Sequence, residues 1–245
     1  MRVLSIIHGA NARSGIFGDV VREAGHELVE RSYAFGEPPP EAPETYDAVM
    51  VFGGVMNVHE VDGHPWLGVE TRALERLLEN EVPVLGVCLG AQLIASAAGA
   101  EASRATRPEI GWYEVETTDE AHDDALFSGM PERFDAFQWH SYQFDHPPGA
   151  VLLARSPVCL QAYRIGETCW GIQFHAEVSK QIAADWISHY GKDPDAIRIG
   201  LDPERERRRL DDEIERWNEF GRTLIDRFLA VAGERAGVAP QRARA

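Results

Sequence analysis

The chain has 245 residues, of which 44% are hydrophobic and 26% charged, a composition typical of a globular protein with one large domain. Its 40 acidic and 24 basic side chains give a formal net charge of −16, which disfavours binding to nucleic acid and to anionic membranes. No apolar run approaches the ~20 residues of a membrane span, and the three cysteines match neither a disulfide framework nor a metal site. We therefore expect a cytoplasmic protein with no metal, cofactor, nucleic-acid or membrane partner.

Short apolar runs rich in β-branched residues predict strands buried on both faces, as in a parallel sheet. In chain order these runs are residues 3–7, 48–52, 83–87 and 170–174, and the first is too short for a signal-peptide core. Between the second and third runs, apolar residues from Trp66 to Leu78 recur at helical spacing, and a further helix over 89–98 stops at Gly99. Alternating strands and helices predict an α/β fold with a mostly parallel sheet and helices on both faces.

The middle of the chain has a different pattern, with shorter β-like segments separated by Asp, Pro and Gly clusters. These segments, residues 112–117, 133–139, 151–154 and 159–163, predict a small antiparallel sheet attached to the parallel core. Helical spacing returns over 182–190 and in a long amphipathic helix over 203–231. We expect one domain over residues 1–233 and a flexible tail over 234–245, where few residues can form a core.

The sharpest chemical signal is Gly86-Val87-Cys88-Leu89-Gly90, at the junction of the third strand and the following helix. Glycines two residues before and after a potential nucleophile form the nucleophile-elbow pattern, in which a tight turn lifts the nucleophile above the sheet. The N-terminal end of a helix also stabilises a thiolate. The segment predicts Cys88 as a nucleophile, and the alternative from these five residues alone is a buried structural cysteine.

A cysteine nucleophile in acyl transfer needs a base, and the base needs an orienting group. Among the nine histidines, only His175 both lies at the end of a predicted core strand and has a carboxylate two residues away, that of Glu177. Residues i and i+2 of an extended chain point to the same side, so Glu177 can bind one imidazole nitrogen while the other faces Cys88. Gly53 and Gly54 directly follow another predicted strand, where backbone N–H groups can bind a developing oxyanion.

Together these segments resemble those of the class I, or triad, glutamine amidotransferases. The resemblance rests on the heptapeptide 86–92 (Gly-Val-Cys-Leu-Gly-Ala-Gln), on the segment 173–178 (Gln-Phe-His-Ala-Glu-Val) and on the Gly53-Gly54 loop. The chain looks most like a stand-alone domain similar to the glutaminase domain of GMP synthase. The resemblance implies a flavodoxin-like sheet, and glutamine or a γ-glutamyl small molecule as the substrate.

The resemblance also implies a role for each matching residue. Cys88 would attack the side-chain amide carbon of glutamine, His175 would act as base and then acid, and Glu177 would orient His175. The backbone N–H groups of Gly54 and Leu89 would form the oxyanion hole. The residues that would hold the substrate are Gly53, Gln92, Ser141 and Tyr142. His140, next to this last pair, is expected to border the glutamine pocket.

Val55 follows the glycine pair at a position where the family often has proline, and this leaves the adjacent peptide free to flip. We therefore expect an oxyanion hole that is not fully preformed, and low basal activity until a partner binds. The chain has no glycine-rich nucleotide loop, so an ATP-dependent synthetase would be a separate polypeptide. The alternatives are a γ-glutamyl peptide or conjugate hydrolase with the same triad, a Cys-elbow α/β hydrolase, and a non-catalytic homologue.

Overall fold

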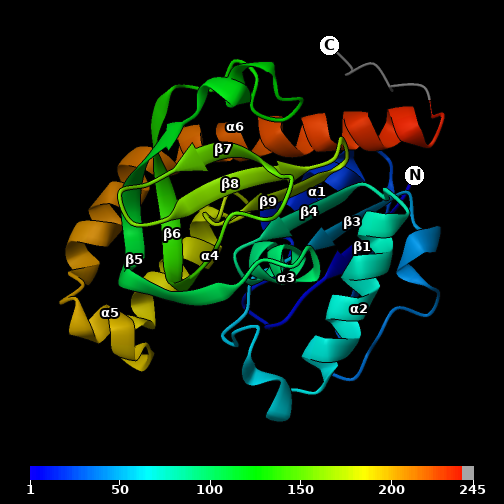
Figure 1. The fold of residues 1–245 in the computed structure, drawn as a ribbon. Helices are drawn as coiled ribbons and strands as arrows, with labels where there is room; N and C mark the ends of the chain where they lie inside the picture. Colours follow the sequence, from blue (N-terminus) through cyan, green and yellow to red (C-terminus); the bar gives the residue numbers. More distant parts are fainter. Residues whose placement is uncertain (239–245) are drawn as a thin grey trace.

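The computed structural model describes residues 1–238 of the chain, and its centre is one mixed sheet (Figure 1). The strand order within these residues is β2-β1-β3-β4-β9-β8-β7-β5-β6. The parallel half consists of β1 (Arg2–Ile6), β2 (Glu27–Arg31), β3 (Ala48–Val51), β4 (Val84–Val87) and β9 (Cys169–Ile172). The antiparallel half consists of β5 (Ala102–Thr117), β6 (Arg133–Phe144), β7 (Val151–Arg155) and β8 (Leu160–Ile165).

Helices cover both faces of the parallel half (Figure 1). The helices are α1 (Gly15–Glu23), α2 (Trp66–Glu79), α3 (Leu89–Ala97), α4 (Lys180–Ser188), α5 (Pro194–Arg198) and α6 (Pro203–Arg235). Short 3-10 turns lie at Pro43–Thr45, Glu60–Asp62, Asp119–Asp123 and Tyr190–Lys192. None of the helices in residues 1–238 is both long and apolar enough to cross a membrane.

Alternation along the strands divides the core into two layers. Val3 and Met50 point to one face of the sheet and pack in a cluster with Phe17 of α1 and with residues of α4 and α6. Leu4 and Val49, one residue along each strand, point to the other face and pack with residues of α2 and α3. Both layers are fully buried, so the parallel strands read as continuous apolar runs.

The structure confirms the predicted α/β class and the mostly parallel core with helices on both faces. The antiparallel strands continue the same sheet, because β8 pairs with β9 through Ala162 and Ile172, so they form no separate small sheet. No sequence pattern predicted α1, β2, α5 or the first half of β5. The strand β2 is at the edge and only partly buried, and its sequence Glu-Leu-Val-Glu-Arg lacks a continuous apolar run.

The C-terminal boundary differs from the prediction. Helix α6 continues to Arg235, so the first two residues of the predicted tail are helical. Alanine, glutamate and arginine in this last turn are good helix formers, which explains why the helix passes the last apolar residue of its stripe. The remainder of the predicted flexible tail, residues 239–245, lies outside the described residues.

Candidate active site

Four loops meet at the carboxyl edge of the parallel strands. They follow β1, β3, β4 and β9, and they contribute His8, the Gly53-Gly54 pair, Cys88 and His175 respectively. These strands are neighbours in the sheet, so residues far apart in the sequence line one cavity. Ligand sites of open α/β sheets lie at this edge.

Cys88 joins β4 to α3 in a sharp turn with a φ of 53° and a ψ of −109°. A non-glycine residue in such a region costs about 1–3 kcal/mol, and the surrounding structure must hold it there. The Cys88 N–H donates to the carbonyl of Ile172 in β9 at 2.8 Å. The flanking glycines allow close packing: a Cβ on Gly90 would lie 2.0 Å from the Val51 oxygen, and one on Gly86 would lie 2.8 Å from backbone atoms of α3. The result is a thiol fixed at the N-terminal end of α3.

His175 lies three residues beyond the end of β9, in a bend. The extended chain predicted for residues 175–177 is therefore wrong, although the two side chains still meet, with 2.8 Å between His175 Nδ1 and Glu177 Oε1. The bend arises because other elements bind this backbone. The His175 N–H donates to the carbonyl of Phe137 in β6, and Trp217 Nε1 of α6 donates to the His175 carbonyl, both at 2.9 Å.

The environment of His175 favours its charged form. Burial lowers the pKa of His175, whereas the charges of Glu177 and Cys88 and hydrogen bonds to both raise it, with a net result of about 10. Since Glu177 occupies Nδ1, the buried Nε2 is left for the thiol and has no other hydrogen-bond partner. Trp186 packs edge-on against the imidazole, 4.8 Å between ring centroids, and restricts its rotation. The arrangement places a protonated imidazole beside the Cys88 sulfur.

The Gly53-Gly54 loop lies against both His175 and Cys88. A Cβ on Gly53 would lie 3.1 Å from His175 Cε1 and 3.6 Å from Cys88 Cβ. A Cβ on Gly54 would lie 2.8 Å from His8 Cβ and 2.9 Å from Leu89 Cδ2. Only glycine fits both positions without displacing a neighbour, so the loop backbone can approach a group bound at Cys88.

Two cavities adjoin at Cys88. The smaller measures about 330 Å³, and its walls include Leu89, Gln92, His140, Ser141, Tyr142 and Asp195. The larger measures about 620 Å³, and its walls include His8, Gly53, Trp186, His189 and His175. Gly54, Val55, Cys88, Trp139, Lys192 and Asp193 border both cavities. The predicted substrate residues thus lie around the predicted nucleophile, with Gly53 on the opposite side from Gln92, Ser141 and Tyr142.

The polar groups of the smaller cavity are already partly engaged. Gln92 Nε2 donates to the Tyr142 carbonyl and to Gln173 Oε1, at 3.1 Å each, which leaves Gln92 Oε1 as an acceptor. Burial raises the pKa of Asp195, but a hydrogen bond from Ser141 and the charges of two arginines lower it more, so the carboxylate stays ionised. Both oxygens of Asp195 already accept hydrogen bonds from Arg104, so the free acceptor that the pocket presents to an ammonium group is Gln92 Oε1.

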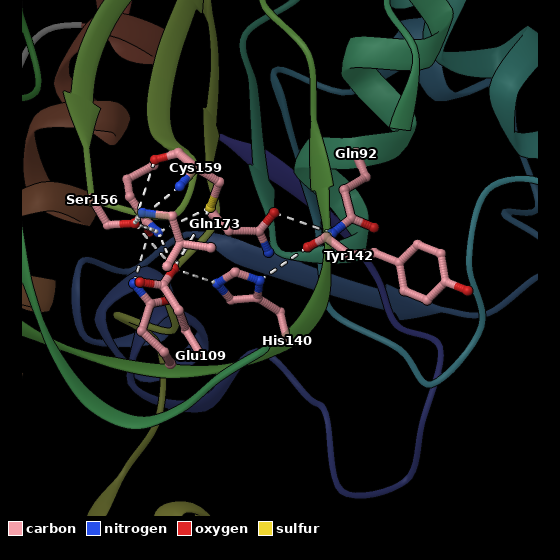
Figure 2. A network of polar contacts seen from close by, with 10 residues as sticks. Gln92, Glu109, His140, Tyr142, Ser156, Cys159 and Gln173 are labelled. Carbon is pink, nitrogen blue, oxygen red and sulfur yellow. Dashed lines mark hydrogen bonds and ion pairs between the residues drawn. The ribbon is translucent and has the colours of Figure 1, made fainter. Parts of the chain in front are cut away.

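A buried polar network lies behind the smaller cavity (Figure 2). The carboxylate of Glu109, whose side chain is 1% exposed, lies 3.2 Å from His140 Nε2. His140 Nδ1 donates in turn to the Tyr142 carbonyl at 2.9 Å, the same oxygen that binds Gln92. The network thus connects the interior of the antiparallel half to the loop that borders the substrate pocket.

Glu109, His140 and Cys159 place possible ligand atoms within 4.8 Å of one another. Glu109 Oε2 accepts hydrogen bonds from Gln161 at 2.8 Å, from Ser156 at 3.2 Å and from the Cys159 thiol at 3.6 Å. These donors occupy Glu109 Oε2, and burial together with the Glu109 charge raises the pKa of Cys159, which keeps the thiol protonated. A protonated thiol is a poor metal ligand, so we assign these three residues to the buried polar network.

Several residues of the site, among them Trp186, Asp193 and His8, have no sequence motif. Trp186 borders the larger cavity beside Trp139, the first residue of the predicted substrate loop, and Trp139 Nε1 donates to Asp193 at 2.9 Å. Asp193 also caps α5, which brings the segment 192–195 over Cys88. His8 lies under the glycine loop and is bound to Glu70. In the sequence each of these residues is a single polar or aromatic side chain within or just after a helix or strand, and such an isolated residue does not by itself predict a site.

The fold and the site together define a class of protein. A strained cysteine at a strand-to-helix elbow, beside a buried His–Glu pair, is the arrangement of a triad enzyme that acts on an amide through a cysteine nucleophile. Residues 21–187 match the family model described as Glutamine amidotransferase class-I. The chain belongs to the class I glutamine amidotransferase family.

Individual relatives agree with this assignment. A crystal structure of a glutamine amidotransferase from Thermotoga maritima is 30% identical, with a TM-score of 0.85, and the match covers 94% of this chain and 98% of that chain. A glutamine-hydrolyzing GMP synthase subunit of Sulfurisphaera tokodaii is 32% identical over 145 residues, which are 58% of this chain and 73% of that protein. A glutamine-hydrolyzing GMP synthase of Aeropyrum pernix is 33% identical over 165 residues, 64% of this chain but 30% of that protein. The chain therefore spans less than a third of that last relative.

Proposed function

We propose that the protein hydrolyses the side-chain amide of glutamine through a cysteine thioester and delivers the ammonia to an acceptor on a separate synthetase. The observation that supports this most directly is the buried His175–Glu177 pair beside the strained Cys88 turn. The names of the relatives support glutamine as the substrate, because two of them are glutamine-hydrolysing GMP synthases.

In the proposed reaction, Cys88 attacks the amide carbon and His175 holds the thiol proton on Nε2. The tetrahedral oxyanion accepts hydrogen bonds from the backbone N–H groups of Leu89 and Gly54. His175 returns its proton to the leaving nitrogen, ammonia departs, and a thioester remains on Cys88. His175 then takes a proton from water, which attacks the thioester and releases glutamate. Glu177 keeps the imidazole in one orientation throughout.

The smaller cavity suits the glutamyl part of the substrate. Gln92 Oε1 is its free acceptor and suits the α-ammonium group of the substrate. The Asp195 carboxylate is already bound by Arg104 and Arg198. At about 330 Å³ the cavity is large enough for an amino acid. Ser141 and Tyr142 contribute through the loop backbone, since the Ser141 hydroxyl is bound to Asp195.

The test is covalent labelling with a glutamine-mimicking electrophile, followed by intact-mass and peptide mass spectrometry. One adduct on Cys88 that glutamine prevents is the expected result. Cys169, a second buried thiol that lines neither cavity, serves as the matched control in Cys88→Ala and Cys169→Ala chains. Labelling that survives in Cys88→Ala contradicts the proposed nucleophile.

A specific observation favours a second candidate, hydrolysis of γ-glutamyl peptides or conjugates by the same triad. The acid His175 borders only the larger cavity, so the leaving nitrogen departs on that side. That cavity measures about 620 Å³, far more than ammonia occupies, and Trp139 and Trp186 line it. Comparing kcat/KM for glutamine and for γ-glutamyl anilide separates the candidates. A higher kcat/KM for the anilide than for glutamine supports the conjugate hydrolase, and turnover of glutamine alone supports the glutaminase.

A further inference from the structure

His8 and Glu70 form a buried polar pair that the proposed reaction does not use. His8 follows β1, Glu70 lies on α2, and both side chains are 0% exposed. His8 Nε2 lies 3.0 Å from both carboxylate oxygens of Glu70, and His8 Nδ1 lies 2.9 Å from the Phe52 carbonyl oxygen. Trp66 stacks on the imidazole with 5.2 Å between centroids and 18° between planes. The imidazole is thus fixed on both edges and on one face.

The partners of the imidazole determine its protonation. A backbone carbonyl can only accept a hydrogen bond, and an ionised carboxylate also only accepts. His8 Nδ1 therefore donates to the Phe52 carbonyl, and the raised pKa of His8 favours a second proton on Nε2, which faces the Glu70 carboxylate. Burial lowers the pKa of His8, but the Glu70 charge, with hydrogen bonds to Glu70 and to the carbonyls of Phe52 and Gly53, raises it overall. The pair holds the Nδ1–H of a buried imidazole against the carbonyl that leads into the glycine loop.

The contacts of the His8 imidazole with two backbone carbonyls orient the two peptide groups of the loop. The Phe52 carbonyl lies 2.9 Å from His8 Nδ1, and the Gly53 carbonyl lies close enough to the imidazole to raise its pKa. In a trans peptide the N–H points opposite to the carbonyl, so the N–H groups of Gly53 and Gly54 point away from His8. Gly53 and Gly54 line the same cavity as Cys88 and His175, so the loop backbone borders the space around the nucleophile. A flipped peptide would lose its contact with the buried imidazole.

We propose that the His8–Glu70 pair presets the Gly53-Gly54 loop as half of the oxyanion hole, with His8 and Glu70 acting as positioning residues. The proposal rests on the proposed glutaminase function. It replaces the expectation drawn from Val55: the side chain of Val55 is 95% exposed and restrains nothing, whereas His8 holds the loop from below. The loop is therefore set without the proline that the family often has.

The test compares Glu70→Gln and His8→Gln with the unmodified chain, using glutamine or γ-glutamyl anilide as substrate. Removing one oxyanion donor lowers kcat by about 10²–10³ in other enzymes, and we expect kcat to fall at least tenfold with KM within about threefold. Alkylation of Cys88 by iodoacetamide forms no oxyanion, so its rate should stay within about twofold. The affinity for glutamate γ-semialdehyde, which binds as a tetrahedral thiohemiacetal, should fall in parallel with kcat.

Glu206→Gln is the matched control, because Glu206 is also a buried, ion-paired carboxylate and lines neither cavity. It should leave kcat, alkylation and aldehyde affinity unchanged. The inference is overturned if Glu70→Gln and His8→Gln both keep kcat within twofold of the unmodified chain. It is also overturned if the rate of iodoacetamide alkylation falls as much as the rate of hydrolysis, because the whole site would then be disordered. An unmodified chain that hydrolyses neither substrate would instead contradict the proposed function, and the two failures are thereby distinguished.

Discussion

Replacing Gly53 with alanine tests the geometry at the centre of the site. The added methyl group would lie 3.1 Å from His175 Cε1, about 0.3 Å inside ordinary contact distance, and 3.6 Å from Cys88 Cβ. His175 cannot move away freely, because Glu177 holds Nδ1 and Trp186 packs against the ring. Gly53 does not have a positive φ, so alanine fits its backbone without strain.

A misplacement of about 1 Å between reacting groups can cost about 10²-fold in rate, so a few tenths of an ångström predict roughly a tenfold fall in kcat/KM. The free energy of unfolding should change by less than ~1 kcal/mol, because the displaced groups are side chains. Steady-state hydrolysis and urea unfolding measure the two quantities. Gly191→Ala is the control, since nothing lies within 4 Å of its added Cβ. Full activity in Gly53→Ala would refute the idea that the proton moves between Cys88 and His175 in the space that borders Gly53.

Three further predictions concern folding and charge. Gly90→Ala would place a methyl group 2.0 Å from the Val51 oxygen, a backbone atom of β3, and should destabilise the fold by more than ~4 kcal/mol in urea unfolding. Ser179→Ala removes the side-chain acceptor for Ile182 N–H at the start of α4 and should cost ~1 kcal/mol in the same measurement. Glu177→Gln removes a charge that raises the pKa of His175 above 6.5 to about 10. Protonated His175 therefore stabilises the fold fully below pH 6.5, and this contribution is lost as the pH rises through about 10. The decline in unfolding free energy over that range should be smaller in Glu177→Gln.

The controls for these predictions come from the same chain. The Glu177→Gln comparison is best made in a Cys88→Ala background, so that the Cys88 thiol does not titrate, and an unchanged pH dependence would contradict the assigned ion pair. Gly63→Ala controls for Gly90→Ala, because the nearest atom to its added Cβ is 3.7 Å away. A stable Gly90→Ala chain would show that the elbow tolerates a side chain at this position. Ser179→Ala with unchanged stability would show that water replaces the cap.

The sequence by itself determined the parallel core and the identity of the catalytic candidates. Continuous apolar runs predicted β1, β3, β4 and β9, because strands buried on both faces consist mostly of apolar residues. Glycines flanking Cys88 predicted the elbow, because side chains would collide there. These signals are local: each depends on residues within a few positions of one another. The edge strand β2 and the helices α1 and α5 lacked such signals.

The tertiary structure decided how distant residues combine. Glu70 and His8 are 62 positions apart, and nothing in either segment indicates that α2 brings a carboxylate under the loop after β3. The extended geometry assumed for His175 and Glu177 was wrong, since backbone bonds from β6 and α6 bend that segment, and the pair forms nonetheless. The two cavities, and hence the room for a leaving group, arise where α4, α5 and the strand-end loops converge. Chemistry between neighbours in sequence can be read from residue types, whereas burial and charge at a site depend on every element that packs around it.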